Sequence, residues 1–242
     1  MAIESRDIVV GGIRVEVVRK DIKNLHLGVY PPNGRVRVAA PLVISDDAVR
    51  LAVIDKLGWI KRQKANFVAQ LRQSQREMVN GESHYFLGRR YRLRVHEGPG
   101  PSSVAIRGVA SLDLHVRPGS STEQREAVLL RWYRDQLKAM VPPLLEQWEH
   151  ALGVRPTGWG IKKMKTKWGS CNPASRRIWL NLELAKRPVQ CLEYILVHEL
   201  VHLLERNHTD RFTGLMDGFM PSWKARRKAL NSGILGHEVW DY

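Results

Sequence analysis

Short runs of alternating apolar residues dominate the first part of the chain. The first four runs cover residues 8–10, 13–17, 25–30 and 36–38. Turn-forming stretches such as Gly11-Gly12 and residues 31–34 separate them. An alternation with a period of two residues is typical of strands that bury one face. The pattern therefore predicts a meander of about four strands.

A helix is predicted after the fourth run. Ser45, followed by Asp46 and Asp47, forms a sequence that starts helices. Apolar residues then recur at helical spacing at Val49, Val53, Leu57, Ile60, Phe67 and Leu71. This spacing predicts one long helix that ends near Arg76. Strand-like runs return at residues 85–87, 91–95, 104–106 and 112–116, so residues 1–119 should form a β-rich unit.

The second half of the chain combines helical patterns with a hairpin. Residues 120–123 can cap a helix that Pro142 and Pro143 should kink or break before residues 144–152 resume it. After a turn at residues 172–175, alternating residues 178–184 predict a strand with one buried face. No internal repeat is visible. We expect an α+β protein with a β-rich domain over residues 1–119 and a second domain over residues 120–242.

The most apolar helical pattern begins at Pro188, a residue that suits the first position of a helix. Its apolar positions are Leu192, Ile195, Leu196, Val197, Leu200, Val201, Leu203 and Leu204. They leave one polar sector, and a helix of this kind is normally buried. Arg206 and Asn207 suit its end, since a cation favours the last turn and Asn tolerates the left-handed conformation.

The polar sector contains the sequence HELVH. His198 and His202 are four residues apart, so on a helix both imidazoles project from one face, as two ligands of a metal ion do. Glu199 lies about 100° around the helix from His198, where it can act as a base beside the ion without binding it. The spacing predicts a Zn²⁺ cofactor. The alternative is a set of ordinary histidines with protein hydrogen-bond partners.

Two residues compete for the place of third ligand. Glu205 would share the helix face of His198 and His202, but about one turn farther along the axis, which is too far for a common ion. His208 follows Asn207, where the chain can fold back and present an imidazole from another direction. We therefore assign His208 to the metal. Glu205 is expected to orient a histidine ring from outside the ligand set.

The composition is that of a soluble globular chain, with 43% hydrophobic and 26% charged residues. The amino terminus lacks a signal-peptide pattern, and no apolar stretch is long enough to span a membrane. A cytoplasmic location is therefore expected. Cys171 and Cys191 are too few for a disulfide framework.

The formal net charge of +15 is large and attracts polyanions. The stretch between Lys162 and Arg177 is the densest part of this charge beside the predicted metal site. Its basic residues are Lys162, Lys163, Lys165, Lys167, Arg176 and Arg177, without an acidic residue among them. No zinc-finger, homeodomain or RNA-binding signature accompanies it. Nucleic acid is thus a secondary candidate partner.

Three segments of the chain carry a family resemblance: WGSC at residues 168–171, the strand-like IWLNLELA and the sequence YILVHELVHLLERNHTDRF. Together they resemble the YgjP-like (DUF45) family of zinc metallohydrolases, which is related to the SprT-like and WLM zincin peptidases. The resemblance is dense over residues 160–230. It implies a zincin-like catalytic core with His198, His202 and His208 as zinc ligands and Glu199 as the catalytic base. Glu205 stands where metzincins have a glycine, which argues against membership of that group.

These observations predict a zinc-dependent hydrolase, most simply a peptidase acting on a peptide or protein. The predicted hairpin could bind an extended peptide by adding a strand. Tyr194, Ser170 and Tyr242 are candidates for stabilising the oxyanion. Two alternatives stay open: a nucleic-acid-associated protease, and a non-enzymatic module in which Cys171 completes a four-ligand structural zinc site.

Overall fold

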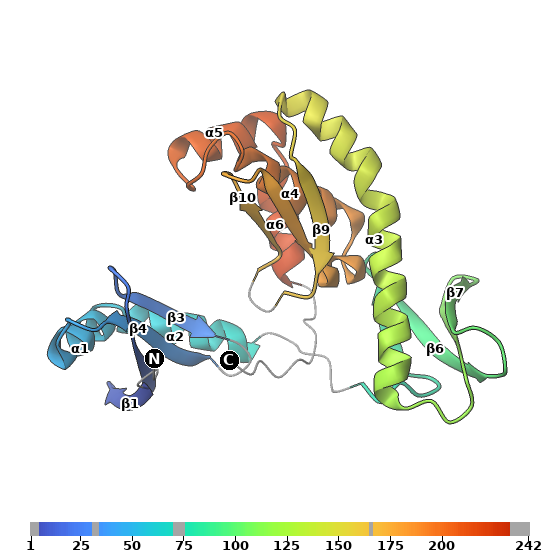
Figure 1. The fold of residues 1–242 in the computed structure, drawn as a ribbon, viewed down its shortest axis with the longest axis horizontal. Helices are drawn as coiled ribbons and strands as arrows, with labels where there is room; N and C mark the ends of the chain where they lie inside the picture. The colour runs from blue at the N-terminus through green and yellow to red at the C-terminus, as the bar shows by residue number, and fades with distance from the viewer. Residues whose placement is uncertain (1–4, 31–33, 70–75, 165–166, 233–242) are drawn as a thin grey trace. The chain divides into compact units, whose positions relative to one another are not determined.

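The computed structural model describes residues 5–30, 34–69, 76–164 and 167–232, with only the backbone of residues 66–69. The chain divides into two compact units between Gln73 and Ser74 (Figure 1). Both units combine strands with helices, which confirms the predicted α+β class.

The first unit contains a four-stranded sheet. Its strands are β1 (Ser5–Val10), β2 (Ile13–Lys20), β3 (His26–Tyr30) and β4 (Arg35–Pro41), close to the four predicted runs. Their order is β1-β2-β4-β3, with β2 and β4 parallel, so the predicted meander is wrong. The most deeply buried strand residues, such as Val15 and Val38, lie on β2 and β4. These two strands are buried because they lie at the centre of the sheet, whereas the less buried β3 lies at an edge.

Two helices pack on this sheet where one long helix was predicted. In α1 (Asp46–Asp55), the Ser45 hydroxyl accepts a hydrogen bond from the Ala48 amide at 3.3 Å, which confirms the predicted cap. The helical path is interrupted at Lys56, and α2 (Leu57–Ala69) follows. Arg76 is not helical, and Leu71 lies outside the described residues.

The second unit begins with another four-stranded sheet, made of β5 (Ser83–Phe86), β6 (Arg89–Glu97), β7 (Ser103–Arg107) and β8 (Ser111–Val116). Its order, β5-β6-β8-β7, repeats the topology of the first sheet, including the parallel central pair. The fold therefore contains a repeat that was not visible in the sequence. The two sheets can share a topology without sharing a sequence, because each strand requires only that apolar residues alternate along it.

The helix α3 (Thr122–Leu152) contacts this sheet at one end and the elements that follow it at the other (Figure 1). Ser121 and Gln124 form a capping box at its start. The helix continues through Pro142 and Pro143, so the predicted alternative of a break is wrong. The neighbouring Val141 and Leu145 are buried, and their packing offsets the hydrogen bonds that proline removes.

The division between the units differs from the boundary expected near residue 119. Leu93 and Leu114 of the second sheet are buried in one core with Leu129 of α3. The hydroxyl of Tyr133 on α3 donates a hydrogen bond to the Tyr85 carbonyl at 2.7 Å. These contacts join strands β5 to β8 to the carboxyl-terminal part of the chain, because neither layer could bury its apolar face alone.

A three-stranded sheet lies beyond α3. The strands β10 (Gly169–Asn172) and β11 (Arg177–Asn181) form the predicted antiparallel hairpin, and β9 (Gly158–Lys162) pairs with β11 in parallel. The strand expected over residues 178–184 ends earlier, because the side chain of Asn181 accepts a hydrogen bond from the Glu183 amide at 3.1 Å. This contact starts a short 3₁₀-helix, η1 (Leu182–Lys186).

The apolar helix α4 (Val189–Val201) follows, with Pro188 as its capping residue. It ends earlier than the predicted Arg206 and Asn207. The amides of Leu203 and Leu204 bond to carbonyls three residues back, both at 2.9 Å, which tightens the chain into a turn. Helices α5 (Asp210–Phe219) and α6 (Trp223–Ser232) complete the described chain. None of the described helices is long and apolar enough to cross a membrane.

Candidate metal centre

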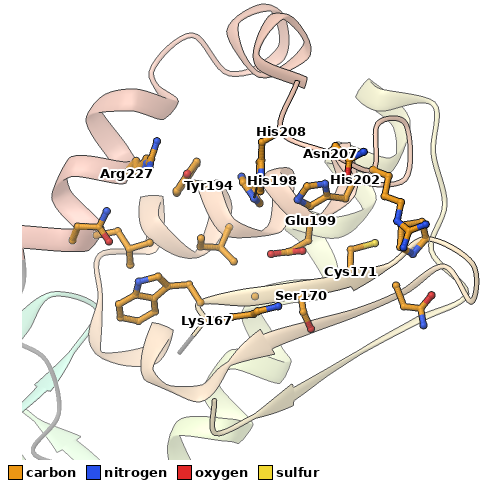
Figure 2. A pocket seen from close by; sticks show the side chains of 18 residues that line it. Lys167, Ser170, Cys171, Tyr194, His198, Glu199, His202, Asn207, His208 and Arg227 are labelled. Atoms are coloured by element: carbon orange, nitrogen blue, oxygen red, sulfur yellow. Dashed lines mark hydrogen bonds between the residues drawn. The ribbon is translucent and has the colours of Figure 1, made fainter. Parts of the chain in front are cut away.

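The three predicted histidines meet at the end of α4. His198 lies in the last turn of the helix, His202 follows its final residue, and His208 comes from the loop before α5 (Figure 2). One nitrogen from each ring lies within 4.8 Å of the others, and the Nε2 atoms of His198 and His208 are 3.0 Å apart. A tetrahedral ion with bonds of about 2.0 Å separates its ligands by roughly 3.3 Å. The three imidazoles therefore fit a metal ion with small side-chain adjustments.

The early end of α4 brings His208 to this place. The tightened turn after Val201 reverses the chain, and Thr209 then starts α5 by accepting a hydrogen bond from the Phe212 amide at 3.3 Å. The ring of Phe212 lies against all three imidazoles, with centroid distances of 5.0 Å, 4.7 Å and 4.7 Å. The ring of Phe212 therefore packs against all three candidate ligands. Our reading of the sequence missed this residue, although it lies within the HTDRF segment that carried the family resemblance.

Two of the three histidines, His198 and His202, are held in the neutral form that binds a metal. Burial, together with the neighbouring His202 and His208, lowers the pKa of His198 to about 3. Burial also lowers the pKa of His202. Neutral imidazoles offer a lone pair to a cation at ordinary pH. In the described part of the chain, the buried Nδ1 of His198 has no hydrogen-bond partner.

Glu205 orients a histidine, as expected, but through a different atom. The Nδ1–H group of His202 donates a hydrogen bond to the backbone carbonyl of Glu205 at 3.1 Å, which leaves Nε2 as the nitrogen that can bind a cation. The Glu205 carboxylate instead accepts a hydrogen bond from the Asn207 amide at 3.3 Å. Among the described residues, the group that meets at this point contains the three histidines and neither Glu205 nor Cys171.

Glu199 lies beside the histidines with only 4% of its surface exposed. Burial raises the pKa of its carboxyl to about 8, while Lys167 and a backbone hydrogen bond from Cys171 act in the opposite direction. A divalent cation nearby would further favour the ionised form. The structure therefore places a desolvated carboxyl group, without a salt-bridge partner of its own in the described chain, next to the candidate metal ligands.

A cavity of about 740 Å³ opens over these residues (Figure 2). Its walls come from β10, from α4 and the turn after it, and from α6. Tyr194 and Ser170, two of the oxyanion candidates, line the cavity, whereas Tyr242 lies outside the described residues. Arg227 of α6 also lines it, a position that sequence reasoning missed because α6 is distant in the chain.

Cys171 also lines the cavity. Burial and the adjacent Glu199 raise the pKa of Cys171 to about 11. Among the described residues, Cys171 does not belong to the group in which the three histidines meet.

The basic stretch between Lys162 and Arg177 makes local contacts. Lys162 and Arg177 both lie over the ring of Trp179, at 4.8 Å and 4.9 Å from its centroid. Lys167 lines the cavity and Lys165 lies outside the described residues. Part of this charge therefore stabilises the small sheet through cation–π contacts.

Comparison with known proteins agrees with this geometry. A family model described as the YgjP-like metallopeptidase domain matches residues 23–233, which covers parts of both units and the whole candidate site. No curated protein matches the chain. The match confirms the resemblance seen in the sequence, and a metallopeptidase domain implies a metal ion. The chain thus belongs to the YgjP-like family, as a metallopeptidase domain whose candidate metal ligands are three converging histidines.

Proposed function

We propose that the chain is a zinc-dependent peptidase with its active site at the end of α4. The observation that carries the proposal is the convergence of three imidazoles beside a buried carboxyl group in one open cavity. His198, His202 and His208 would hold the ion. Three protein ligands leave a coordination position free, as catalytic zinc sites do. Zinc bound there would supply a Lewis acid that polarises a carbonyl group and acidifies water.

Glu199 is proposed as the general base. Its position on α4, directly after His198, directs the carboxyl group toward the cavity that the histidines line (Figure 2). Once ionised beside the cation, it would take a proton from the attacking water and pass it to the leaving amine. The surrounding apolar packing keeps bulk water away from this carboxylate and so makes it a stronger base.

The edge strand β10 suits an extended peptide. It lies at one end of the order β10-β11-β9, and its residues from Gly169 to Asn172 line the cavity. A peptide added alongside an edge strand gains backbone hydrogen bonds irrespective of most of its side chains. We therefore propose a peptide substrate that is bound mainly through its backbone and is cleaved beside His198.

Replacement of Glu199 by Gln tests the proposal. The variant should fold and retain one zinc ion at this site, while peptide hydrolysis falls by about 10²–10⁴-fold, because an amide cannot accept the proton. Metal analysis and turnover of a peptide mixture measure the two effects. Glu146→Gln, on the exposed surface of α3, is the matched control. Near-normal turnover in Glu199→Gln would exclude Glu199 as the base.

Replacement of Cys171 by Ser distinguishes the proposed peptidase from the alternative of a non-enzymatic module with a structural zinc site. The thiol does not belong to the histidine group, so the variant should bind zinc and fold as the unmodified chain does. A joint loss of zinc and of folding would favour a closed four-ligand site instead.

A further inference from the structure

A second group of metal-binding side chains lies on the sheet β5-β6-β8-β7, outside the cavity. Along β8, Leu112 and Leu114 point into the core, so Asp113 and His115 share the opposite face. His96 of the neighbouring β6 is the direct partner of His115 in the register. One ligand atom from each of His96, Asp113 and His115 lies within 4.8 Å of the others.

The two imidazoles are arranged as a pair. The rings of His96 and His115 are stacked, with centroids 4.8 Å apart and planes inclined by 16°. Nε2 of His96 lies 3.6 Å from Oδ2 of Asp113, which is longer than a hydrogen bond. The imidazole of His96 therefore lies near the carboxylate without a direct hydrogen bond to it.

Asp113 lacks the partners that a buried carboxylate needs. The residue is 8% exposed, and among the described residues its buried Oδ1 has no hydrogen-bond partner. The other oxygen is 3.8 Å from Nε of Arg107, again beyond hydrogen-bond length. A buried anion in this state is costly unless a cation or hydrogen bonds compensate it.

The corresponding sheet of the first unit provides an internal comparison. One carboxylate of that sheet, Glu16, lies on β2, which corresponds to β6, the neighbour of the strand that carries Asp113. Glu16 accepts hydrogen bonds from Arg35 at 2.6 Å and from Ser5 at 3.2 Å. Its charge is therefore satisfied within the protein, unlike that of Asp113.

We propose that His96, Asp113 and His115 form a second binding site for a divalent transition-metal ion of the Zn²⁺ type. Two imidazoles with one carboxylate form a donor set that binds such ions more strongly than it binds Mg²⁺ or Ca²⁺, which prefer oxygen ligands. The ion would neutralise Asp113 and connect the parallel strands β6 and β8. None of the three residues lines the catalytic cavity, so the site is separate from the proposed active site.

Arg107 competes with the ion for Asp113. Its side chain is 71% exposed, so the guanidinium can turn into solvent when a cation binds. Removing this competing charge should strengthen metal binding. Arg107→Gln is therefore expected to raise the affinity of the second site, an effect that a purely structural aspartate would not produce.

Zinc stoichiometry of the untagged full chain tests the proposal. After equilibrium dialysis against Zn²⁺, the unmodified chain should hold two ions, and His96→Ala, His115→Ala and Asp113→Asn should each hold one. His198→Ala should lose the ion of the proposed active site and keep the ion of the second site, so occupancy of the two sites can be measured separately. His26→Ala, at an exposed strand histidine outside both groups, should keep two.

A competition titration with a zinc chelator, on variants whose folding is verified by circular dichroism, measures affinity at the second site. His96→Ala should bind there at least about tenfold more weakly, since changes even outside a ligand set cost 10–100-fold. Two ions retained with unchanged affinity in both His96→Ala and Asp113→Asn would overturn the proposal. A single ion in the unmodified chain, lost only in His198→Ala, would overturn it as well.

Discussion

Gly169 of β10 lies directly against Glu199 of α4. A Cβ atom added at Gly169 would lie 2.5 Å from Oε1 of Glu199 and 2.8 Å from Cγ2 of Ile195. Both distances are shorter than contacts between real side chains. The absence of a side chain at residue 169 therefore allows the strand to approach the helix and defines the position of the proposed base.

Gly169→Ala should consequently displace the carboxyl group of Glu199. We expect peptide hydrolysis to fall by about 10²-fold, because a shift of about 1 Å in a catalytic group has such an effect. Overpacking should also lower the free energy of unfolding by about 1–3 kcal/mol. Kinetics and urea denaturation measure both quantities. Gly214→Ala, on α5 where an added Cβ meets no atom within 4 Å, should leave hydrolysis unchanged and raise the free energy of unfolding by up to about 1 kcal/mol, because alanine favours a helix.

The third metal ligand is tested by comparing His208→Ala with Glu205→Ala. His208 contributes an imidazole to the converging group, whereas the Glu205 carboxylate contacts the Asn207 amide. The backbone carbonyl that orients His202 is retained in Glu205→Ala. Zinc titration should therefore show the larger loss of affinity for His208→Ala. The opposite order would overturn the assignment.

Phe212 should matter for metal affinity without being a ligand. Its ring supports all three imidazoles, so Phe212→Leu is expected to loosen them and weaken zinc binding by about tenfold. Calorimetric titration with zinc measures the change. Phe219→Leu, at a more exposed position of the same helix, is the matched control. Equal affinities in the two variants would show that the ring packing is unimportant.

The buried His84 makes stability depend on pH. Burial, together with Arg76, lowers the pKa of His84 from its usual 6.5 to about 4, although Glu82 opposes the change. At a pH between about 4 and 6.5, His84 is therefore protonated in the unfolded chain but not in the folded chain. Stability should therefore decrease as the pH falls from about 6.5 to about 4, by at most about 1.4 kcal/mol per pH unit from this group.

His84→Gln should weaken this dependence, because the amide does not titrate. Urea denaturation at several pH values between 4 and 7 gives the slopes for the two proteins. The slopes are compared rather than the absolute stabilities, since the substitution alters a buried hydrogen bond to Glu82. Parallel curves would contradict the assignment of this pH dependence to His84.

The elements that depend on local spacing could be predicted from the sequence. Alternating apolar residues located the strands of both four-stranded sheets, and the HELVH spacing placed His198 and His202 on one face of a buried helix. The helix caps at Ser45 and Ser121 were also predicted. These features depend on contacts between residues a few positions apart, which a linear pattern records.

Only the tertiary structure decided how distant segments meet. Separate elements are joined by the parallel pairing of β6 with β8, by the close approach of Gly169 to Glu199 and by the packing of Phe212 against three histidines. The end of α4 at Val201, which brings His208 back to the other ligands, also differs from the local signals at Arg206 and Asn207. Burial of apolar surface rewards such contacts regardless of sequence separation, so the order of residues alone does not specify them.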